Sequence, residues 1–201
     1  MSIKCHCGYS SCYKCTIRGA RLEKSVCLGV MKTLLNAWVK ERRKPYSLSL
    51  KNIRHLNAYI SKIKYDVPNE FIRKPRSLNE VDRWKATELR MFLLYTGPVI
   101  MQRFSNSERY AHFLMLSKGI RLLIEFEEDN LKEASFLLNN FVSRLPTLYD
   151  KQFLSYNMHC LTHLTTDCES FGSLQKFGAF KYENFLPQIK RQLRKNNQYC
   201  A

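Results

Sequence analysis

Apolar residues recur at intervals of three and four along most of the chain, which is the spacing of one face of an α-helix. Strict alternation of apolar and polar residues, the pattern of a half-buried strand, is nearly absent. A first helix is predicted from Val26 into the basic run 40–44, before Pro45, and a second follows Ser49 and ends before Pro68. The pattern therefore predicts a mainly helical chain.

The third helix is predicted to begin at a capping box, in which Ser77 is followed three residues later by Glu80. It is expected to stop at Gly97-Pro98, a strong termination signal. Tryptophan and most other aromatic residues fall at core positions of the helical pattern, which favours packing over base stacking. Further helices are predicted over 107–123, 131–145 (before Pro146) and 156–168, and from Phe180 onward.

The chain of 201 residues is 45% apolar and 25% charged, an ordinary globular composition that excludes a disordered or fibrous protein. Its charge balance is unusual, because 33 Lys and Arg residues stand against 17 Asp and Glu residues, for a formal net charge of +16. Such an excess is typical of proteins with a polyanionic partner, nucleic acid first and an acidic membrane surface second. A charge that serves only solubility is the alternative.

Two basic segments are the best candidates for phosphate contacts, since each cation can neutralise one phosphate and steepen the salt dependence of binding. One is extended, and the other belongs to the predicted last helix. A third basic run, at 42–44, fits a nuclear import signal, so the nucleus is the expected location. The candidate contacts are Arg73, Lys74 and Arg76 in the extended segment and Lys190, Arg191, Arg194 and Lys195 in the last helix.

No apolar run reaches the roughly 18 residues of a membrane span, and the N-terminal residues lack the apolar core of a signal peptide. We therefore expect an intracellular protein without a membrane partner. In that setting the eight cysteines are better explained as metal ligands and buried thiols than as a disulfide framework. Buried or incidental thiols are predicted at Cys27, Cys160, Cys168 and Cys200.

Cys12 and Cys15 form a CxxC, whose two thiolates can take adjacent corners of a tetrahedron around zinc. His159 and His163 stand four residues apart on the predicted sixth helix, so their imidazoles share one face. Together the four residues would form a closed, structural Cys2His2 site that pins the N-terminal loop to that helix. Each half taken alone is common and often unrelated to metal. Alternative ligands in the same loop are Cys5, His6 and Cys7.

Several stretches of the sequence, taken in order, resemble one family. The resemblance is to transposase-derived proteins of animal genomes related to the CACTA/EnSpm group, within the wider class of RNase H-like DDE transposases. It covers nearly the whole chain, and its most specific part is the run from 83 to 98. The stretches are 8–19 (GYSSCYKCTIRG), 26–32 (VCLGVMK), 73–78 (RKPRSL), 83–98 (RWKATELRMFLLYTGP) and 155–164 (SYNMHCLTHL).

This resemblance implies a two-metal phosphoryl-transfer site, in which three carboxylates hold two Mg²⁺ ions. The family pattern places a CxxC between the first two catalytic aspartates and a histidine pair in a helical insertion. It places the catalytic glutamate about 20 residues after that pair. Glu183 matches the glutamate position, and Cys12, Cys15, His159 and His163 match the zinc positions.

The two aspartates of the family pattern are not found. The first should precede the CxxC, and the second should stand just ahead of Val26, where Leu22-Glu23-Lys24-Ser25 occurs instead. An internal block is therefore expected to be missing. The implied fold is the helical insertion domain and final helix of an RNase H-like transposase, with most of the core β-sheet absent. The predicted regions are a zinc-knuckle-like loop over 1–25, the insertion-like helices over 26–170 and a C-terminal basic helix over 171–201.

The favoured hypothesis is a truncated, transposase-derived protein with a structural zinc ion and a DNA-binding basic surface, without independent transposase activity. One alternative is an active Mg²⁺-dependent transposase or endonuclease whose carboxylates come from other segments. Another is a domesticated helical scaffold that binds protein. DNA is the expected partner in the favoured hypothesis, and a homo-oligomer is left open.

Overall fold

The structure is a computed structural model that describes residues 25–68, 71, 73–104 and 107–176. Within these ranges every regular element is helical and no strand occurs, which confirms the prediction of a mainly helical chain. The predicted N-terminal cysteine loop and the predicted helix from Phe180 lie outside the described residues. None of the described helices has both the length and the apolar character needed to cross a membrane.

The first two predicted helices are present. The first consists of a π-helical element, η1 (Ser25–Met31), that continues directly into α3 (Lys32–Val39). The second is α4 (Leu50–Asp66), which begins where the Ser49 hydroxyl accepts a hydrogen bond from the Asn52 N–H at 3.1 Å. Its last residue lies two positions before the proline that was expected to end it. Local sequence signals are sufficient to define both ends of α4.

The third predicted helix is divided, and the predicted stop at Gly97-Pro98 is wrong. Two extended residues, Trp84 and Lys85, separate a short 3-10 helix from a longer helical run, and that run passes through Pro98 without interruption. The elements are η2 (Leu78–Arg83), α5 (Ala86–Met91), the π-helical η3 (Phe92–Thr96) and α6 (Gly97–Phe104).

The helix continues through Pro98 because side chains from another helix satisfy the carbonyl groups that the proline leaves exposed. Pro98 has no N–H for the Leu94 carbonyl, and the Gly97 N–H bonds one residue further back than in an α-helix, so Leu93 also loses its usual donor. The Ser117 hydroxyl donates to the Leu93 carbonyl at 2.7 Å, and the Arg121 guanidinium donates to the Leu94 carbonyl.

A long helical hairpin follows, formed by α7 (Ser107–Glu125) and α8 (Glu128–Leu148). The two helices pack closely at Gly119, where an added Cβ would lie 2.9 Å from Leu138. The fifth helix was predicted to end before Pro146, but α8 includes it and ends at Leu148. A proline in the last turn removes only one hydrogen bond, so the helix extends slightly past it.

The sixth predicted helix is present in three joined pieces that cover the hairpin, after the short η4 (Lys151–Phe153). They are α9 (Tyr156–His159), the 3-10 element η5 (Cys160–His163) and α10 (Leu164–Phe171).

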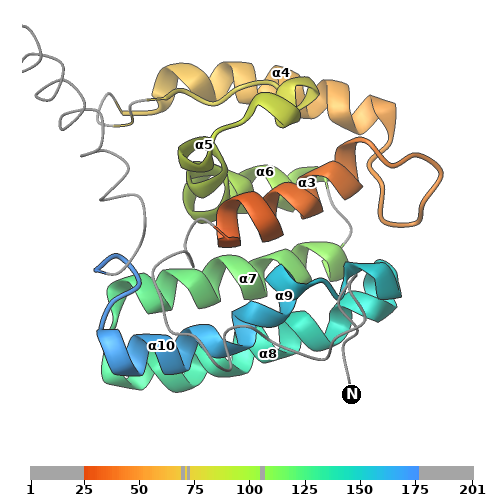
Figure 1. Cartoon of the computed structure of the whole chain (residues 1–201). Coiled ribbons are helices and arrows are strands. Elements are labelled where there is room, and N and C mark those ends of the chain that lie inside the picture. The colour runs from red at the N-terminus through yellow and green to blue at the C-terminus, as the bar shows by residue number, and fades with distance from the viewer. Residues whose placement is uncertain (1–24, 69–70, 72, 105–106, 177–201) are drawn as a thin grey trace, which may run out of the picture.

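The helices are stacked in layers (Figure 1). α4 forms one outer face, α3, α5 and α6 lie beneath it, and the α7–α8 hairpin with α9 and α10 forms the other side. Trp38 and Trp84 are buried, as their spacing predicts. Trp38 contacts Phe113 edge-on at 5.7 Å between ring centroids, and its indole N–H donates to the Tyr149 hydroxyl at 3.1 Å.

Candidate metal centre and nucleic-acid interface

The two predicted histidine ligands lie side by side at the junction of α9, η5 and α10. His159 is the last residue of α9, and His163 is the last residue of η5. Their Nε2 atoms are 3.2 Å apart, and the rings meet nearly at right angles, with centroids separated by 4.9 Å. Both side chains are half-buried. The structure therefore brings together the two predicted ligands that lie within the described residues.

The separation of the two nitrogen atoms suits a shared metal ion. Two imidazole nitrogens, each about 2.05 Å from a tetrahedral zinc ion, lie about 3.3 Å from one another. The observed 3.2 Å agrees with this value. The same distance also suits a hydrogen bond in which one neutral imidazole donates Nε2–H to the other.

Among the described residues, no group of three or more His, Cys, Asp or Glu side chains could hold a metal ion, so a zinc ion at the histidine pair would need further ligands from other parts of the chain. Cys12 and Cys15, the predicted partners, lie outside the described residues. The segment that carries these two cysteines directly precedes η1, and η1 packs against α9. An added Cβ at Gly29 of η1 would lie 2.5 Å from the Asn157 side chain of α9. The ten residues from Cys15 to Ser25 can span up to about 33 Å.

The other thiols for which the structure gives a position behave as the sequence predicts. Cys27, Cys160 and Cys168 are buried in the helical core. Cys200 lies outside the described residues, as do the alternative ligands Cys5, His6 and Cys7.

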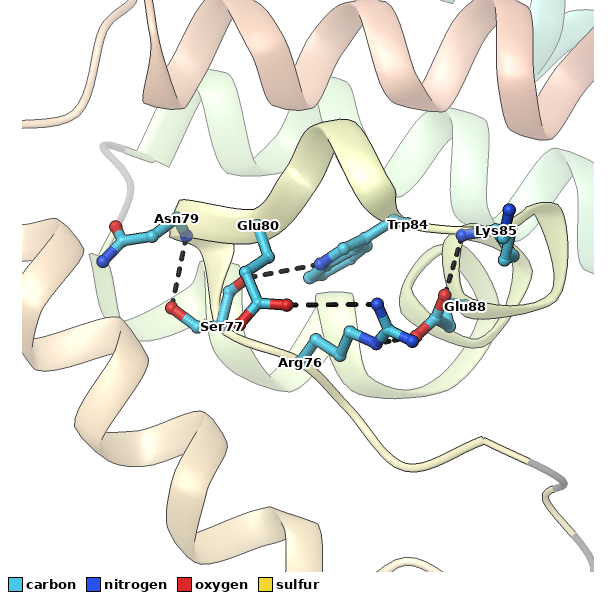
Figure 2. A network of polar contacts seen from close by, with 7 residues as sticks. All are labelled: Arg76, Ser77, Asn79, Glu80, Trp84, Lys85 and Glu88. Atoms are coloured by element: carbon cyan, nitrogen blue, oxygen red, sulfur yellow. Dashed lines mark hydrogen bonds and ion pairs between the residues drawn. The ribbon is translucent and has the colours of Figure 1, made fainter.

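The structure gives Arg76, a predicted phosphate contact, an internal role (Figure 2). Its Nε lies 2.8 Å from a carboxylate oxygen of Glu88, a side chain that is 2% exposed, and a second guanidinium nitrogen lies 3.9 Å from Glu80. The other Glu88 oxygen accepts the Lys85 N–H at 2.7 Å. The positive charge of Arg76 therefore compensates carboxylates of its own chain.

The same region corrects the predicted capping box. Ser77 does cap η2, but its hydroxyl accepts from the Asn79 N–H at 3.2 Å, and the Glu80 carboxylate turns toward Arg76 (Figure 2). The return bond from a carboxylate to the N-cap backbone is made further along, by Glu88 at the start of α5. The extended residues Trp84 and Lys85, between η2 and α5, create this second helix start.

Of the other predicted phosphate contacts, Lys74 and Arg73 lie within the described residues, and the C-terminal set does not. Lys74 donates hydrogen bonds to the carbonyls of Val67 and Pro68, where it caps the C-terminal end of α4. Arg73 is exposed. The C-terminal set, Lys190, Arg191, Arg194 and Lys195, and the glutamate position Glu183 lie outside the described residues.

A basic surface that the sequence analysis did not single out lies on the outward face of α4. Lys51, Arg54 and Lys62 are exposed there, together with His55. The signal was present in the sequence, because these residues occupy the helical positions opposite Ile53, Leu56 and Ile60. The sequence analysis instead predicted phosphate contacts where basic residues lie close together in the sequence, at 73–76 and 190–195.

His112 is a core residue rather than a ligand. Its ring is fully buried, stacks on Phe141 with centroids 4.2 Å apart, and places Nε2 2.9 Å from the Phe141 carbonyl. Burial is the main cause that lowers the pKa of His112 from 6.5 to about 4, and the nearby positive charge of Arg144 adds to it, against the opposing effect of the Phe141 hydrogen bond. The imidazole is therefore neutral at physiological pH, with Nε2 donating to the carbonyl.

Comparison with known proteins leaves the function to be argued from this geometry. No protein-family model matches the chain, and no curated protein or solved structure matches it.

Proposed function

We propose that this chain is a DNA-binding helical module, related to CACTA/EnSpm-type transposases, that fastens its N-terminal segment with a structural zinc ion and has no transposase activity of its own. The observation that carries the zinc site is the 3.2 Å separation of the His159 and His163 Nε2 atoms. Cys12 and Cys15 complete the ligand set. Two thiolates and two neutral imidazoles balance the charge of Zn²⁺ in a closed, tetrahedral site.

The zinc ion acts in the proposal as a clamp. η1 already packs against α9, so a metal bound to the histidine pair holds the chain ahead of η1 against the same part of the fold. Because the unfolded chain has no preformed site, the binding free energy of such an ion contributes directly to folding.

The charge of the chain supports DNA as the partner. A formal net charge of +16 attracts a polyanion, and exposed cations such as Arg73 and those of α4 are available for phosphate contacts. The proposal assigns no transposase activity to the chain, because two-metal phosphoryl transfer needs several carboxylates at one site. The family resemblance supplies only Glu183.

Metal analysis of the purified full chain tests the zinc site. We expect one zinc ion per chain, lost in Cys12→Ser, Cys15→Ser, His159→Ala and His163→Ala. His55→Ala is the matched control, because it removes an exposed imidazole from α4. An unchanged zinc content in both Cys12→Ser and His163→Ala would refute the proposed zinc site.

Incubation of the full chain with plasmid DNA and Mg²⁺ tests the lack of catalysis. No nicking is expected. Nicking that disappears in Glu183→Gln would show that the chain is an active nuclease and would contradict this part of the proposal.

A further inference from the structure

α4 is an amphipathic helix on the outer face of the fold (Figure 1). Its inward side carries the buried residues Ile53, Leu56 and Ile60. A helix turns 100° per residue, so the positions opposite this apolar stripe form one outward row spaced by three and four residues. That row, which we call the α4 outer face, consists of Lys51, Arg54, His55, Ala58, Lys62 and Tyr65, and all six are exposed.

Within the part of the chain that the structure describes, the cations of the α4 outer face have no acidic partners. Among the described residues, Lys51, Arg54 and Lys62 take part in no ion pair, and the only acid of α4 is Asp66 at its C-terminal end. Some cations elsewhere on the surface are paired, as are Lys118 with Glu133 and Lys40 with Asp82. The α4 outer face is therefore a row of uncompensated positive charge.

The placement of these cations opposes helix stability. The first turn of α4 contains no acidic residue and includes Lys51, although the helix dipole favours anions at that end. Lys51 and Arg54, three residues apart, also repel one another. A requirement for stability does not explain this arrangement, whereas an anionic partner does, because it relieves both effects.

The shape of the surface indicates which polyanion fits. An α-helix is about 10–12 Å in diameter with its side chains, and the major groove of B-form DNA is about 12 Å wide. The small side chain of Ala58, at the middle of the row, allows the helix to approach the groove closely. Around the helix axis, Arg54 and His55 lie on opposite sides of Ala58. Lys51 and Lys62 are separated by about 16 Å along the helix axis, at 1.5 Å per residue.

Two other polyanions fit less well. Double-stranded RNA has a deep, narrow major groove that side chains cannot read. A membrane surface binds amphipathic helices through their apolar face, but the apolar face of α4 is buried against the rest of the fold, where α4 contacts α6 and η2.

We propose that α4 is the helix that enters the major groove of duplex DNA, with Lys51, Arg54 and Lys62 contacting phosphates along the groove. This inference rests on the proposed DNA-binding function and assigns it to a surface. It differs from the contacts predicted by sequence, since Arg76 and Lys74 are engaged within the fold.

The test is the salt dependence of duplex DNA binding by the full chain, measured by fluorescence anisotropy. The α4 variant is Lys51→Gln/Arg54→Gln/Lys62→Gln, since glutamine is a good helix former and preserves α4. The matched control is Lys132→Gln/Arg144→Gln/Lys151→Gln, which removes the same charge from exposed positions on α8 and η4. Circular dichroism verifies that both variants retain the helical content of the wild-type chain.

We expect the slope of log K against log salt to become shallower by about 2.7 in the α4 variant, at roughly 0.9 per lost phosphate contact, and to change little in the control. Equal losses in both variants would overturn the assignment to α4 while leaving DNA binding intact. A wild-type chain that does not bind duplex DNA at low salt would instead refute the proposed function itself.

Groove competition provides a second measurement. Methyl green, a major-groove ligand, should compete with the chain for duplex DNA, and netropsin, a minor-groove ligand, should not. The reverse result would overturn the inference. So would an α4 variant that loses binding to double-stranded RNA or to anionic vesicles but binds duplex DNA like the wild-type chain.

Discussion

The ion pair between Arg76 and Glu88 makes a prediction that separates a structural role from a DNA-binding role. The Glu88 side chain is 2% exposed, and that of Arg76 is 35% exposed. Replacing Arg76 with Gln leaves a carboxylate in the fold without its counter-ion. Removing one partner of a fully buried pair costs about 3–5 kcal/mol, and an exposed pair contributes about 0–1 kcal/mol.

The expected loss for Arg76→Gln lies between these limits, at about 2 kcal/mol, because the pair is buried on one side only. Urea unfolding of the full chain, followed by circular dichroism, measures it. In a chain of this size a loss of about 2 kcal/mol corresponds to a fall in Tm of roughly 4–8 °C. A double-mutant cycle with Glu88→Gln isolates the coupling, which should account for most of the loss.

The matched control is Arg73→Gln, which removes an exposed arginine from the same segment and should change the free energy of unfolding by less than about 0.5 kcal/mol. If Arg76→Gln leaves stability unchanged and instead weakens DNA binding, the internal role of Arg76 is refuted and its sequence-based assignment as a phosphate contact is restored.

Two further predictions concern the core. Because the pKa of His112 is lowered to about 4, its neutral form is favoured in the fold, so the free energy of unfolding should decrease as the pH falls from about 6.5 to 4. The decrease is at most about 3 kcal/mol. Urea unfolding across this pH range measures it, and the free energy of unfolding of His112→Gln should depend less on pH than that of the wild-type chain. Ser117→Ala should lower the free energy of unfolding by about 1–3 kcal/mol in the same assay, since it leaves the Leu93 carbonyl without its donor. Ser143→Ala is the control for this change, because its hydroxyl is exposed, and a similar loss there would contradict the explanation.

The helices themselves could be predicted from the sequence, because the information that defines them is local. The apolar spacing and the Ser49 cap define α4, and the spacing of Tyr110, Phe113 and Leu116 defines α7. The passage of the helix through Gly97-Pro98 could not be predicted, because Ser117 and Arg121, which satisfy the freed carbonyls, lie on a different helix.

The candidate sites were predictable only in part, for the same reason. The spacing of His159 and His163 indicated that the rings share a face, and they do. The internal role of Arg76 depends on Glu88, which lies in the first turn of a second helix after the extended residues Trp84 and Lys85, and composition does not reveal that pairing. The α4 outer face could not be identified from the sequence, because its exposure depends on how the other described helices pack around α4.

Zinc K-edge absorption spectroscopy of the full chain tests the central claim most directly. The account predicts a first coordination shell with two sulfur atoms at about 2.3 Å and two nitrogen atoms at about 2.0–2.1 Å, from Cys12, Cys15, His159 and His163. A chain purified with zinc available that holds none, or a shell without sulfur, would contradict it and would leave the histidine pair as a hydrogen bond within the fold.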